Sequence, residues 1–261
     1  MLTTPIEAFE DNYFWILEDQ TQTQNHISVI DPGSFREVDR WCASHSKRVD
    51  QIFLTHHHPD HIGGVRKLKA KFGSKVYAHF KDQNRIADVD HWLQDGDTIE
   101  IGSIKGCIKA IPGHTEGHIC YWFKDQKKAF VGDTLFALGC GRLLGGTAEQ
   151  MWESLKWIRS LPEDTLIYCA HEYTLSNLRF VQELFVNNEA LNNGALNDRA
   201  IKLRSLRERG ESTIPFLLQE ELFTNPFLRC DEQEFATSLG FSGLSPSEVF
   251  AQIRLKKDHF K

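Results

Sequence analysis

The chain has 261 residues, of which 41% are hydrophobic and 25% charged, so it can bury a substantial core as one large domain or two modest ones. A net charge of −6 gives no general attraction to nucleic acid or acidic membranes, and no apolar run approaches transmembrane length. The N-terminal segment has neither a basic start nor a long apolar stretch, and the six cysteines include no Cys-x-x-Cys pair. We therefore expect a cytoplasmic protein without a signal peptide and, since nothing in the pattern demands assembly, a monomer.

A histidine-rich segment lies between a predicted strand at 49–54 and a predicted helix at 65–72. It contains four side chains of the kind that bind metals: His56, His58, Asp60 and His61. Alternate residues of an extended backbone face the same way, so His56 and His58 can bind one ion, whereas Asp60 and His61, beyond the turn at Pro59, face a neighbouring position. Because imidazole and carboxylate are normal ligands of catalytic zinc, the segment predicts two metal ions side by side. The alternative is a polar loop that happens to be rich in histidine.

Three further residues of this kind each follow a short apolar run. Strand-like runs at 107–111, 129–131 and 166–170 lead to His114, Asp133 and His171, respectively. A layered α/β scaffold brings several strand ends to one rim, which favours a common site. Each residue taken singly could instead be a hydrogen-bonded core residue.

Counting ligands gives two sites with open positions, which are typical of catalysis, whereas a structural zinc has its coordination closed, usually by cysteines. Two ions about 3.5–4 Å apart hold a hydroxide between them and lower its pKa. We expect two divalent ions per chain, zinc foremost, although a ligand set of nitrogen and oxygen also accepts iron or manganese. The first site comprises His56, His58 and His114, the second Asp60, His61 and His171, and Asp133 bridges the two.

The sequence pattern changes near residue 173. Strand-like and helical runs alternate up to Tyr173, and the remainder is almost wholly helical. Thr147 and Gln150 predict a capping box at the start of one helix, and Ser245 with Glu248 predicts another. We therefore predict two domains, 1–173 and 174–261.

The metal-type residues resemble the motif of the metallo-β-lactamase superfamily. The motif is His56-x-His58-x-Asp60-His61, followed by Gly113-His114, Gly132-Asp133 and Ala170-His171. Within the superfamily, segments 55–64, 112–118, 131–136, 140–142, 171–173 and 225–229 resemble glyoxalase II, the hydroxyacylglutathione hydrolases. The likeness extends from near Thr3 to Phe260. It implies an α/β fold, the αβ/βα four-layer sandwich, as a metal-binding catalytic domain over 1–173, followed by a smaller all-α substrate-binding domain over 174–261.

The resemblance also implies an activity. This is hydrolysis of an S-(2-hydroxyacyl)glutathione thioester, foremost S-D-lactoylglutathione, to glutathione and D-lactate, a step of methylglyoxal detoxification. A hydroxide between the metals attacks the thioester carbonyl, and the thiolate leaves with little need for a protein acid. The catalytic residues are then Asp60, which orients the hydroxide or accepts its proton, and the bridging Asp133.

In glyoxalase II, the positions that match Arg142, Tyr173, Arg254 and Lys257 bind glutathione, whose two carboxylates call for cations and hydrogen-bond donors. Taken alone, the segment 254–257 is typical of a solvated tail. One departure from the family is Leu144, which stands where an aromatic residue is usual. It predicts weaker substrate binding with the chemistry intact.

Four more residues invite a functional interpretation. Thr115, His118 and Thr134 can orient metal ligands, although ordinary turn or core hydrogen bonds explain them equally well. Cys140 suggests a nucleophile but has no obvious histidine or acidic partner in the sequence.

Three other functions are alternatives. A β-lactamase or lactonase fits the metal residues alone, but a secreted β-lactamase is expected to carry a signal peptide and often a cysteine ligand. A glutathione persulfide dioxygenase uses one iron, whereas Asp60, His61 and His171 complete a second ligand set here. A non-catalytic redox module of the flavodiiron type has Glu in place of His58 and an additional flavin-binding domain, which does not fit in the remaining residues.

Overall fold

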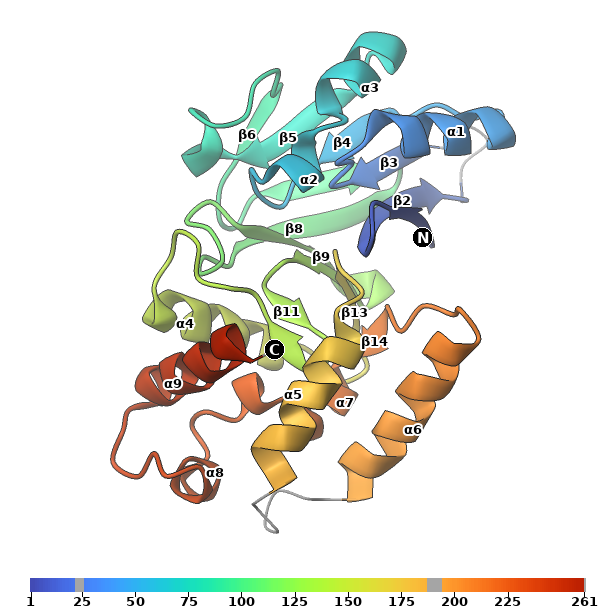
Figure 1. Ribbon diagram of the computed structural model, residues 1–261. Coiled ribbons are helices and arrows are strands. Elements are labelled where there is room, and N and C mark those ends of the chain that lie inside the picture. The colour runs from blue at the N-terminus through green and yellow to red at the C-terminus, as the bar shows by residue number, and fades with distance from the viewer. Residues whose placement is uncertain (22–25, 187–193, 261) are drawn as a thin grey trace. The chain divides into compact units, whose positions relative to one another are not determined.

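The computed structural model describes residues 1–21, 26–186 and 194–260 (Figure 1). The chain divides into two compact units, which we call unit 1 (Met1–Ala110 with Glu116–Gly132) and unit 2 (Ile111–Thr115 with Asp133–Lys261). In the ranges that are described, no helix is long and apolar enough to cross a membrane.

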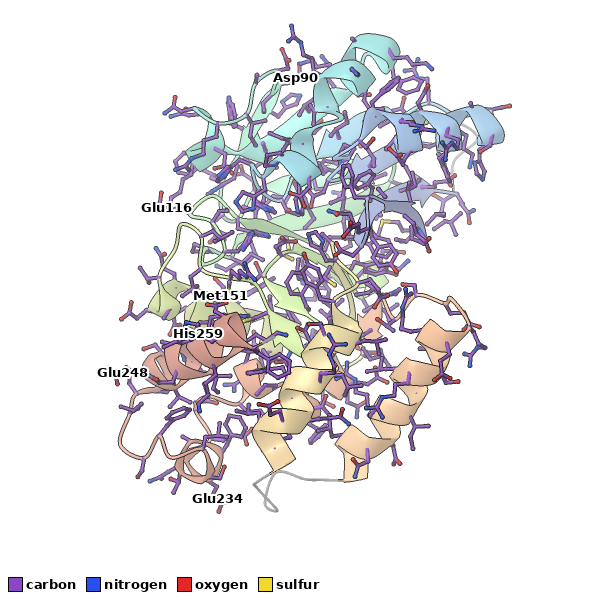
Figure 2. All side chains as sticks on the ribbon, viewed as in Figure 1. Asp90, Glu116, Met151, Glu234, Glu248 and His259 are labelled. Atoms are coloured by element: carbon purple, nitrogen blue, oxygen red, sulfur yellow. The ribbon has the colours of Figure 1, made fainter. Side chains whose placement is uncertain are left out.

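Unit 1 begins with a six-stranded mixed sheet in the order β1-β2-β3-β4-β5-β6. Strands β1 to β3 pair antiparallel and β3 to β6 parallel, so the carboxyl ends of the parallel strands lie at one edge. Asp90, labelled in Figure 2, directly precedes the last strand, and its carboxylate accepts a hydrogen bond from Val76 N of the neighbouring strand at 2.9 Å. The strands are β1 (Leu2–Ala8), β2 (Asn12–Asp19), β3 (His26–Ile30), β4 (Gln51–Phe53), β5 (Lys75–His79) and β6 (His91–Leu93).

Three helices connect the parallel strands: α1 (Phe35–His45), α2 (Pro59–Ile62) and α3 (Val65–Phe72). Helix α3 has the predicted bounds, and the strand predicted at 49–54 is β4, which is shorter. Gly73 ends α3 with φ 71°, a left-handed conformation that glycine adopts without strain.

A second, antiparallel sheet of unit 1 faces the first. The ring of Phe53 in the first sheet lies 5.2 Å from that of Tyr121 in the second, and the Tyr121 hydroxyl donates a hydrogen bond to Leu54 O at 2.8 Å. The strands are β7 (Thr98–Ile101), β8 (Ile104–Ala110), β9 (Ile119–Phe123) and β10 (Lys128–Gly132), with the 3-10 turns η1 (Phe80–Asp82) and η2 (Lys124–Gln126).

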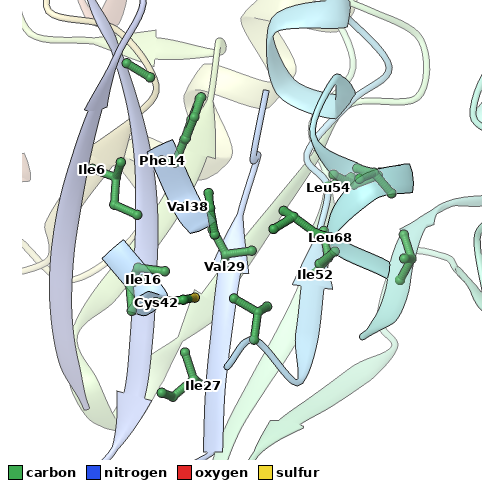
Figure 3. Packing of buried hydrophobic residues seen from close by; sticks show 14 of the residues in the cluster. Ile6, Phe14, Ile16, Ile27, Val29, Val38, Cys42, Ile52, Leu54 and Leu68 are labelled. Carbon is green, nitrogen blue, oxygen red and sulfur yellow. The ribbon is translucent and has the colours of Figure 1, made fainter. Parts of the chain in front are cut away.

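The core of unit 1 lies between the first sheet and its helices (Figure 3). Val38 and Cys42 of α1 and Leu68 of α3 pack on Val29 and Ile52 of the sheet. Every residue of β2 is buried, because helices cover one face of the sheet and the second sheet covers the other. Full burial of each such aliphatic side chain contributes about 1.5–3 kcal/mol.

Unit 2 is mainly helical, as predicted for its C-terminal part. Both predicted capping boxes are confirmed: Thr147 Oγ1 accepts from Gln150 N, and the Glu248 carboxylate (Figure 2) accepts from Ser245 N at 2.8 Å. Its elements are β11 (Leu135–Phe136), β12 (Gly139–Cys140), α4 (Ala148–Arg159), β13 (Leu166–Cys169), α5 (Thr174–Val186), α6 (Gly194–Glu208), β14 (Phe216–Leu217), α7 (Leu218–Thr224), η3 (Pro226–Leu228), α8 (Gln233–Ser238) and α9 (Pro246–His259).

A buried polar network joins α6, α7 and the β11–β12 hairpin. Arg199 of α6 forms an ion pair with Glu221 of α7, and both side chains are almost completely buried. Glu221 also accepts hydrogen bonds from Leu138 N and Asn225 Nδ2, each at 2.8 Å. Because an unpaired buried charge is costly, this network fixes the hairpin that carries Cys140.

Candidate metal centre

The four metal-type residues of unit 1 lie in the loop that follows β4. His56 Nε2 and His58 Nδ1 are 3.0 Å apart, and His61 Nε2 lies 3.4 Å from Asp60 Oδ2. Two ligands of one tetrahedral zinc ion lie about 3.3 Å apart, since each bond measures about 2.0–2.1 Å. The donor atoms of each pair thus have the separation that a shared ion requires.

Hydrogen bonds on the far side of the rings determine which nitrogen faces the other donors. Thr55 Oγ1 donates to Asp31 Oδ2 at 2.6 Å, so its oxygen is left to accept from His56 Nδ1 at 3.0 Å. His61 Nδ1 lies 3.0 Å from the same Asp31 oxygen. With the protons on Nδ1, the lone pair of each ring lies on Nε2, the nitrogen that faces His58 or Asp60.

Sequence reasoning missed Asp31 and Asn12. Asp31 directly follows β3, just as the histidine-rich loop follows β4, so an acid past the end of a strand was the signal that could have found it. Asn12 Nδ2 donates to Asp60 Oδ2 at 3.0 Å and holds that carboxylate. A single asparagine at the start of a strand gives no comparable signal.

His118 is fully buried and stacks on His56, with ring centroids 4.7 Å apart and ring planes 19° apart. Gly132 makes room for this arrangement: a Cβ there would lie 2.8 Å from His118 Nε2 and 2.5 Å from Thr55 Oγ1. With φ 48°, this position also favours glycine. His118 therefore lies against a predicted ligand.

Unit 2 contains the other three metal-type residues, all of them buried. Asp133 Oδ2 lies 3.5 Å from His114 Nε2 and 3.4 Å from His171 Nε2. His114 Nδ1 donates to Arg142 O at 2.8 Å, because a carbonyl can only accept, and this leaves the Nε2 lone pair on the side of Asp133. Asp133 thus lies between two histidines, the place that a bridging carboxylate needs.

The residues predicted to bind substrate all belong to unit 2. Tyr173 is 37% exposed and stacks on His171. Arg142 is exposed, and its Nε lies 3.8 Å from Asp258 Oδ1. Arg254 is buried and donates from Nη1 to Cys140 O at 2.8 Å, and its Nη2 lies 3.0 Å from the same Asp258 oxygen. A solvated tail at 254–257 is therefore wrong for Arg254.

Lys257 Nζ donates to Ser176 O at 3.3 Å and lies over the rings of Phe180 and Phe260. Burial, followed by the positive charges of Arg254, Arg179 and Arg142, lowers the pKa of Lys257 to about 8. These four cations form a local basic patch in a chain of net negative charge. Arg179 was missed because it lies on α5, far from the other three in sequence.

The surroundings of Cys140 do not suit a nucleophile. Its thiol is buried, and burial raises its pKa to about 11, which outweighs the opposing effect of Arg254. A reactive cysteine needs a lowered pKa, so this environment disfavours the nucleophile hypothesis.

Thr115 and Thr134 take part in turns through their backbones. Thr115 O accepts from Gly113 N, and Thr134 O accepts from Gly141 N, each at 3.1 Å. Thr115 Oγ1 has no hydrogen-bond partner among the described residues. The structure thus gives both a local role beside His114 and Asp133.

Two family models cover almost the whole chain: the metallo-beta-lactamase superfamily over residues 15–171 and the hydroxyacylglutathione hydrolase C-terminus over 172–260. The hydroxyacylglutathione hydrolase of Methylococcus capsulatus is 42% identical over 98% of this chain and 97% of its own length. That of Pseudomonas paraeruginosa is 44% identical over 98% of each. The crystal structure of ETHE1 from Myxococcus xanthus superposes with a TM-score of 0.66 at 22% identity, covering 98% of this chain and 97% of its own.

These similarities confirm the predicted fold class, a metallo-β-lactamase fold followed by a helical C-terminal part. The fold and the histidine and aspartate clusters indicate a divalent metal site in a metal-dependent hydrolase. The chain belongs to the hydroxyacylglutathione hydrolase family, within the metallo-beta-lactamase superfamily.

Proposed function

We propose that the chain hydrolyses S-(2-hydroxyacyl)glutathione thioesters, foremost S-D-lactoylglutathione, to glutathione and the free 2-hydroxy acid. The observation that carries this proposal is the near-full-length identity to hydroxyacylglutathione hydrolases, which includes the C-terminal part. That part distinguishes this family from superfamily members that share only the metal motif.

We propose further that the seven metal-type residues hold two divalent ions, with zinc foremost and iron or manganese also compatible. The donor separations of 3.0–3.5 Å within each unit support this assignment, as do the hydrogen bonds that orient His56, His61 and His114. When bound, such ions supply Lewis-acid activation of water and of the thioester carbonyl. The proposed ligands are His56, His58 and His114 for one ion, Asp60, His61 and His171 for the other, and Asp133 for both.

The catalytic residues in this proposal are Asp60 and Asp133. Asn12 holds Asp60 Oδ2, which fixes the carboxylate for orienting the attacking water and accepting its proton. Asp133 lies between His114 and His171, where its carboxylate would supply a ligand oxygen to the ions that these imidazoles would hold. The departing group is the anion of a fairly acidic thiol, so no protein acid is required.

Glutathione carries two carboxylates, and the basic patch of unit 2 supplies cations for them. Arg142, Arg254 and Lys257 provide positive charge, and Tyr173 provides a hydroxyl. Arg254 also has a positioning role, because its bond to Cys140 O holds the segment that leads to Arg142.

The predicted division into a catalytic domain (1–173) and a substrate-binding domain (174–261) is part of the proposal. The meeting of the two family models at residues 171 and 172 supports it. A monomeric, cytoplasmic enzyme stays an expectation, which sedimentation of the purified chain and fractionation of cells would test.

Steady-state turnover tests the proposed substrate. We expect the purified protein to consume S-D-lactoylglutathione far faster than the coenzyme A thioester of the same acid, because only the first carries the two glutathione carboxylates. Equal rates on both thioesters would contradict glutathione recognition. Turnover of a lactone or of glutathione persulfide, without thioester loss, would instead favour one of the other functions of this fold.

A further inference from the structure

One histidine of the metal loop has no place in the proposed ligand set. His57 lies between His56 and His58, and alternate side chains of an extended segment point to opposite sides. Its Nδ1 lies 3.0 Å from Asp82 Oδ1, and its side chain is 23% exposed. Asp82 ends the 3-10 turn η1, which directly follows β5.

Asp82 is a carboxylate with no exposed surface. Besides His57, the guanidinium of Arg85 reaches it, with Nη1 3.3 Å from Oδ1. None of the groups able to hold a metal in the described part of the chain includes His57, His79 or Asp82. Burying a carboxylate costs free energy that its contacts must offset. The pair that Asp82 forms with His57 therefore needs a structural or functional explanation.

The same segment also contacts a second loop. His79, at the end of β5, is buried and lies near the backbone of Gly117. A Cβ on Gly117 would lie 2.6 Å from the Asp82 carboxylate, so the backbone packs directly on that group. The next residue is His118, whose ring stacks on His56.

We propose that Asp82 is a positioning residue for the metal centre. Its contact with His57 holds the loop 55–61 on the side opposite to His56 and His58, and its contact with Gly117 holds the backbone beside His118. Both contacts fix the orientation of His56, one from the neighbouring residue and one through the stacked ring. This inference rests on the metal centre proposed above.

The physical reason is the geometric precision that metal binding demands. Ligand nitrogens must be held near a bond length of about 2.0–2.1 Å, and groups that orient the ligands typically change metal affinity by about 10–100-fold when removed. A loop that is free to rotate about His57 would have to be ordered by the metal itself, which weakens binding.

The test measures the zinc dissociation constant of the purified full-length protein by chelator competition, together with the melting temperature of the metal-free form. Asp82→Ala and His57→Ala each remove the contact, whereas His57→Asn keeps an N–H donor near the position of Nδ1. Glu18→Ala is the matched control, because Glu18 is a buried carboxylate of unit 1 that pairs with Lys47, away from the metal loop.

We expect the two alanine variants to weaken zinc binding at least about tenfold. Asp82→Ala removes both contacts, so the double variant should bind zinc no more weakly than Asp82→Ala, and His57→Asn should stay near the wild type. Glu18→Ala should lower the melting temperature and leave zinc affinity unchanged. Because His57 is partly exposed, His57→Ala carries the test even if Asp82→Ala does not fold.

Alanine variants that melt at a lower temperature but bind zinc as tightly as the wild type would overturn the inference and leave Asp82 a stability residue. A wild-type protein that binds no divalent ion would instead contradict the metal centre itself, and the inference with it.

Discussion

Tyr173 lies flat on His171, with ring centroids 4.7 Å apart and ring planes only 6° apart. The edge of Phe136 supports both rings, at 6.0 Å from His171 and 5.2 Å from Tyr173. His171 is 4% exposed and Tyr173 is 37% exposed, so the tyrosine covers the histidine and remains accessible. One residue therefore links a proposed metal ligand to the proposed substrate contacts.

Two substitutions of Tyr173 separate its support of His171 from its proposed contact with the substrate. Tyr173→Phe keeps the stacked ring and removes the hydroxyl, so we expect KM to rise about fivefold with metal content unchanged, as for one lost hydrogen bond of about 1 kcal/mol. Tyr173→Ala also uncovers His171, and metal retention during dialysis should fall. Steady-state kinetics and metal analysis of both variants would decide, and full metal retention by Tyr173→Ala would show that the stack does not support His171.

We expect the charge of Lys257 to make substrate capture sensitive to pH. Burial, followed by the charges of Arg254, Arg179 and Arg142, lowers the pKa of Lys257 to about 8 in the protein. The ammonium is present below this pH and lost above it, so kcat/KM for the anionic thioester should fall as pH rises through about 8, since kcat/KM reports ionisations of the free enzyme.

Lys257→Arg supplies the control, because a guanidinium stays charged over this range. The ratio of kcat/KM between wild type and variant should decline above pH 8. If the ratio is constant from about pH 7 to about pH 9.5, the charge of Lys257 takes no part in binding.

Leu144 offers a gain-of-affinity test. It is 61% exposed, and its backbone N–H donates to His114 O at 3.0 Å, so its side chain lies on the surface at a loop bonded to a proposed ligand. Leu144→Tyr should lower KM about fivefold, the effect of one added hydrogen bond of about 1 kcal/mol, with kcat unchanged. Leu144→Phe is the control without a hydroxyl, and an equal KM in all three proteins would refute the prediction.

The Arg199–Glu221 pair is predicted to matter for stability. Glu221→Ala leaves the Arg199 charge buried without its partner, which costs about 3–5 kcal/mol of the free energy of unfolding. Lys202→Ala, which breaks the exposed pair with Glu220 between the same two helices, should cost less than about 1 kcal/mol. Urea unfolding of both variants provides the comparison, and similar losses would show that burial does not govern these pairs.

Local sequence signals predicted much of the fold. The apolar period of 65–72 and the capping residues Thr147 and Ser245 are properties of a few neighbouring residues, and α3, α4 and α9 begin where these signals indicate. The short strand β14 carries no such signal: it exists because Phe216 and Leu217 pair with β13, about 50 residues earlier in the chain.

The residues of the site also fall into those that the sequence could predict and those that it could not. His56, His58, Asp60 and His61 were recognisable because metal binding needs particular donors at close spacing. Asp31, Asn12 and Asp82 act through hydrogen bonds or contacts to that loop from other elements. Only Asp31 had a sequence signal, its place directly past the end of a strand. Arg254 illustrates the converse, since its charge suggested a solvated tail while the fold buries it against Cys140.

The most direct test of the central claim is titration of metal-free protein with zinc, with S-D-lactoylglutathione hydrolysis followed at each step. The account predicts that activity appears with metal and reaches its maximum at two ions per chain, and that His56→Ala or His171→Ala lowers the stoichiometry and the activity together. Full thioester hydrolysis by the metal-free protein, or activity that is complete at one ion and unchanged in the His171→Ala variant, would contradict it.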